Sequence, residues 1–271
     1  MSLITISQSK GSGGEHIARR VAETLQLQLY DDQRLTAEAQ RMGIRAEDFR
    51  GLDEKAPGFF QRLLSNRPEL FLDLMETVVY EVARNGQGVI VGHGSQMLLQ
   101  DFDCALHVFV HAPLARRIER LAQEQNLRTE TAEKLIRKSD SAQKGFFQFA
   151  FHQEFTDPSH YDLILNTQKL SWDSAARMVI DAARVEEIQA CSLTALETME
   201  RLGKVKKIQA ELLKNGINLA TLKIDAEGDA MVVRGFTFTL EEKEIIEEAV
   251  QNVPNVASVK ADVSVVSPGH E

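Results

Sequence analysis

The stretch Ile4-Thr5-Ile6-Ser7-Gln8-Ser9-Lys10-Gly11-Ser12-Gly13-Gly14-Glu15-His16-Ile17-Ala18 decides the fold. A short apolar run leads into a glycine-rich turn. An amphipathic helix follows, in which Ile17, Val21 and Leu25 recur every four residues. Glycines allow backbone N–H groups to approach an anion, and the N-terminus of the helix adds a partial positive charge. The order of strand, glycine turn and helix therefore predicts a phosphate-binding loop.

This loop matches the P-loop pattern G-x-x-x-x-G-K-[ST] only in part. Gly13 takes the place of the second glycine, whereas Gln8, Gly14 and Glu15 stand where the first glycine, the lysine and the hydroxyl residue are expected. In a complete loop the lysine neutralises the β- and γ-phosphates, and the hydroxyl holds magnesium. The alternative interpretation is a tight turn between strand and helix that binds no ligand.

Composition narrows the classes of protein to which the chain can belong. The 271 residues are 43% hydrophobic and 26% charged, which suits one or two globular domains. A formal net charge of −9 argues against duplex nucleic acid as a partner. The two cysteines predict no disulfide framework, and the scattered histidines predict no zinc site. Neither a signal peptide nor an apolar run of bilayer length is present, so we expect a cytoplasmic protein without a transmembrane segment.

Short apolar runs alternate with helical patterns over residues 1–190. Besides the first strand, the predicted strands cover residues 28–30, 88–91, 106–110 and 161–166, and one helix is expected from Pro68 to Arg84. Residues 33–66 are expected to be mostly helical. The alternation predicts an α/β fold with a parallel sheet flanked by helices.

Ligands bind at the carboxyl ends of the strands in such sheets. Four groups of residues follow strand ends and are expected to converge on one face: Gly11–Gly14, Asp31/Asp32, Gly92–Gly94 and the arginines after Pro113. Residues 116–144 are the locally basic segment of an acidic chain, with eight Lys/Arg against five Asp/Glu. The alternative for this segment is a solvated helix face.

The pattern changes after about residue 190. A helix over 193–214 ends at Asn215-Gly216, two strands over 219–224 and 231–236 are joined by a loop over 225–229, and Thr239 with Glu242 predicts a capping box for a further helix. A last strand is expected over 256–266. This order, α-β-β-α-β, offers no crossover long enough for a parallel pair, and we therefore predict two domains: 1–190, and a small α+β domain over 191–271.

Residues 1–185 resemble the cytidylate kinase-like family of nucleoside-phosphate kinases. The shared segments are ITIS…GSGG…IARRVAETL, LYDD, VIVGHG, HVFVHAPLARRIERL and HQEFTDPSHYDLILNT. The family often carries a GSGGRE loop that already lacks the usual lysine. The resemblance implies a P-loop kinase fold, ATP and Mg²⁺ as cofactors, a nucleoside monophosphate acceptor with a pyrimidine base, and a mobile basic lid.

The resemblance also implies roles for individual residues. The ATP phosphates would be lined by Lys10, Gly11, Ser12, Gly13, Gly14 and Glu15. The acceptor nucleotide would be bound by Asp31, Asp32 and His93. The lid would clamp the transferring group and carry the catalytic residues Arg117, Arg137, Asp140 and Lys144.

Several positions depart from the family pattern. Glu15 replaces the arginine of the GSGGRE loop, so a carboxylate faces the triphosphate unless it serves as an oxygen ligand for Mg²⁺. His93 and Lys144 each stand where relatives carry arginine, and either change loses a bidentate fork. These departures predict a slow, altered or lost kinase.

Residues 200–266 resemble the BON domain, a small α-β-β-α-β module, through LGKVKKIQAELL, AEGDAMVVRGF and TLEEKEIIEEAVQNVPNVASVKADVSVV. Members are associated with binding of phospholipid, sugar or other proteins, and the alternative is a packing or oligomerisation module. Two other functions therefore remain open beside the enzyme. One is a catalytically degenerate kinase fold that senses nucleotide, and the other is an assembly protein that forms a homo-oligomer or binds a partner through 191–271.

Overall fold

The first apolar run forms β1 (Ser2–Gln8), the central strand of a five-stranded parallel sheet. The strand order is β2-β3-β1-β4-β5, and every neighbouring pair is parallel. The other strands are β2 (Leu29–Tyr30), β3 (Gln87–Val91), β4 (Ala105–His111) and β5 (Leu163–Asn166). Each lies within a residue or two of its predicted range, and the predicted α/β class is confirmed.

The computed structural model describes residues 2–42, 68–84, 86–189, 193–227, 230–253, 256 and 258–266. The helical expectation for residues 33–66 is confirmed for its first part by α2 (Asp32–Arg41). Residues 43–66 lie outside the described residues. The predicted helix at Pro68 is α4 (Pro68–Ala83).

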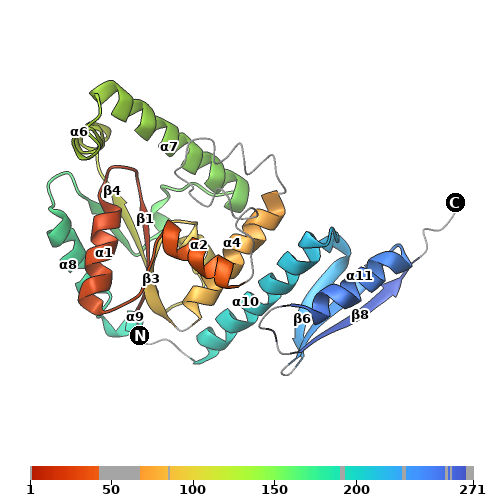
Figure 1. The fold of residues 1–271 in the computed structure, drawn as a ribbon. Coiled ribbons are helices and arrows are strands. Elements are labelled where there is room, and N and C mark those ends of the chain that lie inside the picture. Colours follow the sequence, from red (N-terminus) through yellow and green to blue (C-terminus); the bar gives the residue numbers. More distant parts are fainter. Residues whose placement is uncertain are drawn as a thin grey trace.

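Helices cover both faces of the sheet (Figure 1). On one face lie α1 (Gly14–Leu25) and α8 (Trp172–Ala182), which pack against each other. On the other lie α4, the short α5 (Ser95–Leu98) and the long α7 (Thr129–Phe151). The remaining helices of this part are α6 (Leu114–Glu124), which packs on α7, and α9 (Glu186–Gln189).

Alternation along β1 separates two hydrophobic cores. Leu3 faces the core that contains α4 and α7, whereas Ile4 and Ile6 face the core that contains α1 and α8. β1 is buried along most of its length because successive side chains point to opposite faces and helices cover both. The loop after β1 is therefore held by a rigid strand.

The C-terminal part contains a three-stranded sheet of order β6-β7-β8. Its elements are α10 (Leu193–Lys214), a 3₁₀ turn (Leu219–Thr221), β6 (Leu222–Glu227), β7 (Ala230–Thr237), α11 (Leu240–Gln251) and β8 (Val259–Val265). The Thr239 half of the predicted capping box is confirmed, because its side chain accepts from the Glu242 amide (3.1 Å); the Glu242 side chain accepts from the amide of Phe238, one residue before the cap (3.1 Å).

Two expectations about this small sheet were wrong. β7 and β8 pair in parallel, with Met231 beside Val259, whereas no parallel pair was expected. The helix α11 provides the crossover that such a pair needs. The loop between β6 and β7 is also shorter than predicted, because Glu227 pairs directly with Ala230.

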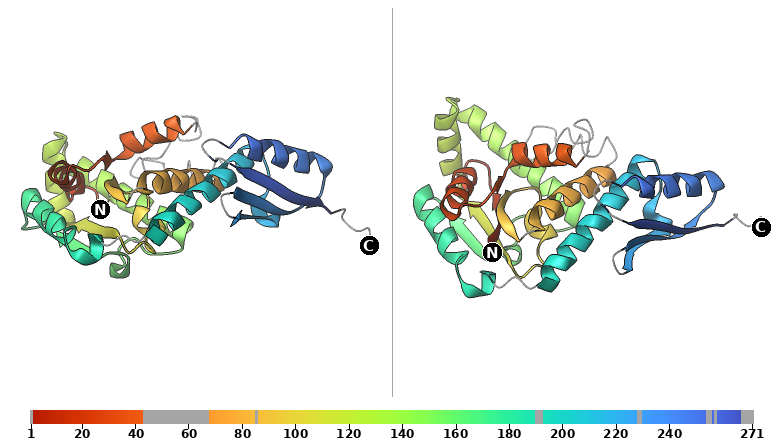
Figure 2. Two further views of the ribbon diagram at one scale, coloured as in Figure 1. Left: turned by 90° about the horizontal axis from the view of Figure 1, so that it is seen from below. Right: turned by 60° about the horizontal axis from the view of Figure 1, so that its bottom comes forward.

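Helix α10 packs against both parts of the protein (Figure 2). Met199 and Ala210 belong to the core that contains α4, whereas Ile208 and Leu212 belong to the core under the small sheet. The domain boundary at 190/191 stays a prediction. The helix that follows it is shared by two cores.

Two further observations concern the chain as a whole. No helix among the described residues is long and apolar enough to cross a membrane. Cys104 is buried at the start of β4 and is disulfide-bonded. The count of two cysteines, from which no disulfide framework was expected, did not indicate this bond.

Candidate functional site

The glycine loop between β1 and α1 is anchored by hydrogen bonds of the buried residue Ser12. Ser12 is fully buried, and its hydroxyl donates a hydrogen bond to the carbonyl of Val110 in β4 (2.9 Å). The Ser12 carbonyl accepts from Thr167 Oγ1 (2.8 Å) and from Arg120 Nη1 (3.3 Å). The Ser12 side chain, predicted to line phosphates, thus anchors the loop to the strand beside it.

The backbone of this loop carries unused hydrogen-bond donors. Gly13 has a φ of +90°, in the left-handed region that favours glycine, and α1 begins at the next residue. Among the described residues, no backbone carbonyl accepts from the amides of Gly11, Gly13 or Gly14. Such N–H groups at a helix N-terminus are a common arrangement for binding an anion. The loop therefore offers phosphate a binding surface that does not depend on a lysine.

The side chain of Gln8 fills the space that a lysine at position 14 would need. A Cβ placed on Gly14 would lie 2.7 Å from the Cβ and Oε1 atoms of Gln8. Gln8 donates to Glu15 Oε1 (3.1 Å), and the Gln8 carbonyl accepts from Gln143 Nε2 of α7 (3.3 Å). The absence of the lysine is therefore built into the packing around the loop.

The aromatic side chain of Trp172 lies beside the loop, and its place there was not predicted from the sequence. The Trp172 ring stacks on His16 at 4.1 Å with an interplanar angle of 6°, and the Arg120 guanidinium lies 5.8 Å from the centre of the Trp172 ring. A Cβ on Gly13 would lie 2.1 Å from Trp172 Nε1. The available signal was Ser171, a typical N-cap residue, which caps α8 and so places Trp172 at the start of that helix, against α1.

Arg117 and Asp140 form a bidentate ion pair between α6 and α7. Both distances from guanidinium nitrogen to carboxylate oxygen are 2.9 Å. The same guanidinium donates to the Lys10 carbonyl (3.3 Å) and to the Ala112 carbonyl (3.1 Å). Arg117 is buried, so its role in this structure is to connect α6 and α7 to the glycine loop.

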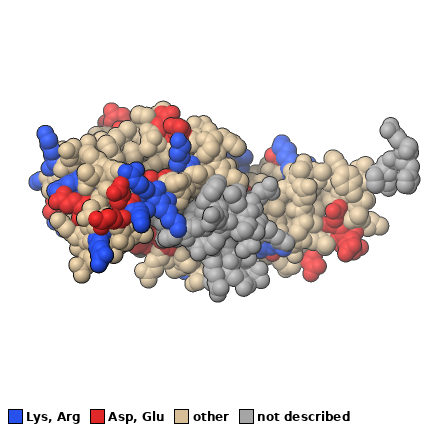
Figure 3. Space-filling model, turned by 90° about the horizontal axis from the view of Figure 1, so that it is seen from above, with Lys and Arg blue, Asp and Glu red and all other residues tan. Residues whose placement is uncertain are grey.

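The other predicted lid residues lie on the surface of α7. Arg137 pairs with Glu133 one turn earlier (2.8 Å), and Lys144 is exposed one turn after Asp140. Basic and acidic side chains are intermixed on this side of the protein (Figure 3). The basic segment thus forms ion pairs within α6 and α7. No ion pair of the Lys10 ammonium is formed within the part of the chain that the structure describes.

The predicted acceptor residues Asp32 and His93 lie side by side. His93 Nε2 donates to Asp32 Oδ1 (2.6 Å), and the His93 side chain is only 1% exposed. His93 has a φ of +60°, between two glycines that also have positive φ. A non-glycine residue is held in this conformation only where its surroundings define it strongly. The hydrogen bond therefore fixes a strained loop beside α2.

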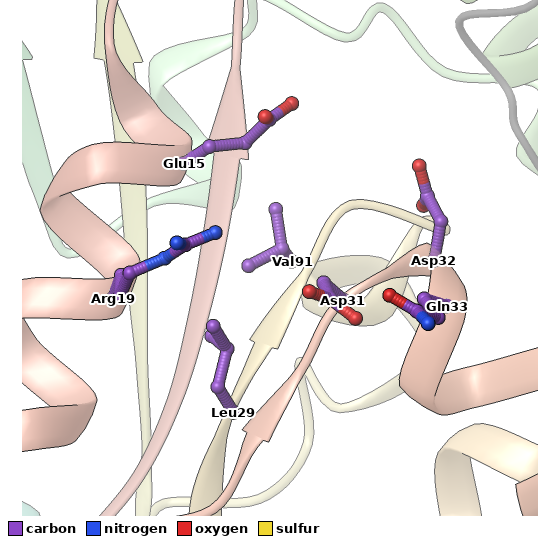
Figure 4. Close-up of a pocket in the computed structure, with 7 residues that line it drawn as sticks. All are labelled: Glu15, Arg19, Leu29, Asp31, Asp32, Gln33 and Val91. Atoms are coloured by element: carbon purple, nitrogen blue, oxygen red, sulfur yellow. The ribbon is translucent and has the colours of Figure 1, made fainter. Parts of the chain in front are cut away.

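A cavity of about 210 Å³ opens next to the glycine loop (Figure 4). Its lining residues are Glu15, Arg19, Leu29, Asp31, Asp32, Gln33 and Val91. Leu29 and Val91 form an apolar floor between the two helices, α1 with Glu15 and Arg19 on one side and α2 with Asp31 and Asp32 on the other. One oxygen of Asp31 accepts from the Arg34 amide (2.9 Å) and so caps α2.

The three carboxylates of this cavity are the candidate metal ligands. Among the described residues, no group of three or more His, Cys, Asp or Glu is arranged to hold a metal ion. Mg²⁺ is usually bound by one or two carboxylates together with phosphate oxygens and waters. Glu15, at the start of α1 beside the loop amides, fits a metal that arrives with a nucleotide, and it does not form a site by itself.

A neutral histidine lies at the end of β4, close to the loop. Burial first and then the positive charge of Arg117 lower the pKa of His111 below its ordinary value. Its ring stacks on Phe109 with the centroids 5.6 Å apart. Positive charge near the loop therefore comes from lysine and arginine, and His111 adds none at neutral pH.

A family model, described as the cytidylate kinase-like family, matches residues 3–169. The chain belongs to the cytidylate kinase-like family. The matched segment contains every predicted site residue. Similar curated proteins include a cytidylate kinase of Staphylothermus marinus, 29% identical over 182 residues that cover 66% of this chain and 94% of the relative. A cytidylate kinase of Methanothrix thermoacetophila is 27% identical and covers 69% of this chain and 99% of its own.

Similar solved structures cover about two thirds of the chain. One is an uncharacterized protein from Eubacterium ventriosum, with a TM-score of 0.49 and 22% identity, covering 68% of this chain and 98% of its own. Another is the shikimate kinase from Acinetobacter baumannii in complex with shikimate, with a TM-score of 0.39 and 13% identity, covering 67% of this chain and 92% of its own.

Proposed function

We propose that this family member is a nucleoside monophosphate kinase, which transfers the γ-phosphate of ATP to a nucleoside monophosphate with a pyrimidine base. The observation that carries the proposal is the set of unused amides at Gly11, Gly13 and Gly14 at the N-terminus of α1. The relatives named above, which are cytidylate kinases, support a pyrimidine acceptor. Under this proposal the protein is a transferase whose P-loop binds the nucleotide ATP.

The chain's own residues define the roles in the proposed reaction. The amides of the loop bind the phosphates of ATP, and Glu15 holds Mg²⁺, which when bound neutralises charge on the β- and γ-phosphates. The hydrogen bond between Asp32 and His93 holds the loop after β3 in place beside α2, where the acceptor would bind. The lysine that usually contributes positive charge is excluded by Gln8, so we infer a weaker activity than in kinases with the full motif.

Direct phosphotransfer assays test this proposal. The full-length protein is incubated with ATP and Mg²⁺ and with CMP, UMP, dCMP or AMP in turn, and the product diphosphate is measured. We expect turnover with at least one pyrimidine monophosphate. A folded protein whose melting temperature rises with nucleotide but which forms no product with any acceptor would contradict the kinase and favour a nucleotide sensor.

The variant Glu15→Gln tests the metal role separately. If Glu15 is a ligand of Mg²⁺, the Mg²⁺ concentration for half-maximal rate rises in the variant, because one anionic ligand is lost. Glu124→Gln serves as a control, since it removes one carboxylate charge from α6, outside the cavity, where Glu124 lies 3.9 Å from His16. A faster rate in Glu15→Gln at every Mg²⁺ concentration would instead show that the carboxylate merely repels ATP.

We further propose that residues 191–271 are a BON-like module. The observed order α10, β6, β7, α11, β8 supports this, since it is the α-β-β-α-β order of that module. We infer that this module binds a partner protein or a second copy of the chain. Measurements of the molecular mass of the full chain in solution test whether it forms a homo-oligomer. A cytoplasmic location belongs to the same proposal. Cell fractionation tests this location. The test matters because Cys104 is disulfide-bonded and disulfides are uncommon in the cytosol.

A further inference from the structure

Arg19 stands out among the residues that line the cavity. It lies one turn after Glu15 on α1, and its guanidinium points across the cavity toward Val91 and Asp31 (Figure 4). Three carboxylates line the same cavity, yet within the described chain no ion pair of Arg19 is formed. The neighbouring Arg20 behaves differently, because it lies 3.5 Å from Asp173 and 3.9 Å from Glu23.

The charges of the cavity exclude one class of ligand group. Even when Glu15 holds Mg²⁺ bound to ATP, two negative side chains, Asp31 and Asp32, oppose one positive side chain, Arg19, so the walls keep an excess of negative charge. Like charges repel strongly at short range in a partly enclosed site. A phosphate group is therefore better placed at the loop amides, and a neutral part of the acceptor is better placed in the cavity.

The hydrogen-bonding groups define that neutral part more closely. A guanidinium only donates hydrogen bonds, and ionised carboxylates only accept them. A matching ring needs acceptor atoms on the α1 side, donor atoms on the α2 side, and an apolar face for the floor of Leu29 and Val91. Cytosine meets this requirement through its O2 and N3 acceptors and its amino group. Uracil carries a donor at N3 and an acceptor oxygen in place of the amino group.

We propose that Arg19 is a specificity-determining residue that binds the acceptor edge of an amino-pyrimidine base. The inference rests on the proposed function, because it assumes that the glycine loop binds the phosphates of ATP and that the acceptor phosphate lies next to them. A carboxylate of α2 then accepts from the amino group of the base. Uracil is rejected because its oxygen would face that carboxylate without a shared proton.

Binding measurements on the full chain test this inference without turnover. The protein is first saturated with a non-hydrolysable ATP analogue and Mg²⁺. CMP and UMP are then titrated into it in separate calorimetric experiments. We expect tighter binding of CMP than of UMP. Arg19→Met should weaken CMP binding by about 10- to 100-fold, as for loss of a bidentate contact to a base, and bring the two affinities together.

Two matched variants complete the test. Arg20→Met removes the neighbouring arginine, which faces away from the cavity, and should leave both affinities unchanged. Arg19→Lys keeps the charge and loses the fork, so it should retain only part of the preference for CMP. The inference is overturned if Arg19→Met binds CMP as Arg20→Met does, if Arg19→Lys keeps the full preference, or if the unaltered protein binds no CMP at millimolar concentration.

The test of Arg19 can fail or succeed independently of the test of the proposed function. Phosphotransfer by the unaltered protein decides the function, and the comparison of Arg19 and Arg20 variants decides the inference. A protein that binds CMP through Arg19 but forms no CDP would contradict the kinase and support the base-reading residue. A protein that forms CDP equally well after Arg19→Met would support the kinase and contradict the role of Arg19 in reading the base.

Discussion

Gly13 is the residue at which the loop meets its surroundings most closely. Its φ of +90° is strained for any other residue, and an added Cβ would lie 2.1 Å from Trp172 Nε1. We predict that Gly13→Ala destabilises the protein by about 2–4 kcal/mol, from left-handed strain together with overpacking. Urea unfolding followed by circular dichroism measures this loss.

Gly216 provides the matched control at the end of α10. It has a similar φ of +80°, but no atom lies within 4 Å of an added Cβ. Gly216→Ala should therefore cost only the backbone strain, about 1–2 kcal/mol. Equal losses in the two variants would show that Trp172 gives way easily and does not hold the loop.

His107 of β4 makes the stability depend on pH. Its Nε2 lies 3.2 Å from the Leu99 carbonyl, which can only accept, so Nε2 carries the proton and Nδ1 accepts from Thr5 Oγ1 (2.8 Å). Burial lowers the pKa of His107, and the charge of Asp162 opposes this effect only in part. The imidazole is therefore neutral in the folded protein.

The sign of the pH effect follows from this lowered pKa. The unfolded chain binds a proton on this histidine near its ordinary pKa of about 6.5, whereas the folded protein binds it only at lower pH. The free energy of unfolding therefore falls as the pH drops below about 6.5, by at most about 1.4 kcal/mol per pH unit from this residue. His107→Gln should flatten the slope in urea unfolding between about pH 5 and 7. An unchanged slope would assign it to other groups.

Sequence patterns located the residues of the loop but not the tertiary contacts around them. The glycine turn, Asp32 and His93 follow strand ends, and that position alone predicted that they lie close together. Trp172 and Arg19 are ordinary residues of amphipathic helices in the sequence. Their proximity to the site depends on how α1 and α8 are placed over the sheet, which local periodicity does not specify.

At the scale of elements, an ion pair adds to the apolar contacts that hold α6 against α7. Arg117 is 10% exposed and connects Asp140 with the loop, whereas Arg137 is 62% exposed and pairs only within α7. We predict that Arg117→Ala lowers the free energy of unfolding by about 2–3 kcal/mol, because a buried hydrogen-bonded charge pair is broken. Arg137→Ala should change it by less than about 0.5 kcal/mol.

Kinetics distinguish the structural from the clamping role of these arginines. If the lid closes over the transferring group as predicted, Arg137→Ala lowers kcat while its stability stays unchanged. Denaturant titrations and steady-state rates are measured on both variants. Unfolding losses of the same size in both would contradict the assignment of Arg117 as the connecting residue.

Most elements were predictable because their signals are local. Apolar runs, the Ser171 cap and the capping box at Thr239 each involve residues within a few positions of one another. The parallel pairing of β7 with β8 was not predicted, because the length of α11 was not considered as a crossover. Pairing between strands depends on contacts distant in sequence, and α11 determines which edge of β7 the last strand reaches.

At the scale of the whole molecule, α10 joins two hydrophobic cores. One side of it contributes Met199 and Ala210 to the core with α4, and Lys206 lies 2.8 Å from Asp73 and 2.5 Å from Glu76 of α4. Burial raises the pKa of Glu76, and this ion pair with Lys206 only partly compensates. Residues that the sequence assigns to the second domain therefore stabilise the first.

Two truncations test whether the first core folds without this helix. A chain of residues 1–190 lacks α10, and a chain of residues 1–215 keeps it. In the longer one, Ile208→Gln and Leu212→Gln replace side chains that would otherwise be exposed when the small sheet is removed. We predict that 1–190 is less stable than 1–215 by about 3 kcal/mol or more, since burial of one large apolar side chain contributes about 1.5–3 kcal/mol.

Urea unfolding of the two truncations is compared with that of the full chain. The 1–215 chain should unfold close to the first transition of the full protein, because the contacts of α10 with α4 are intact. Equal stability of 1–190 and 1–215 would show that α10 belongs only to the second unit and that the boundary at 190/191 is also a folding boundary. The expected difference would instead mean that any partner bound at the small sheet acts on a helix that is part of the kinase-like core. Changes there would then reach α4, which packs against α2, the helix that begins at Asp32 beside His93.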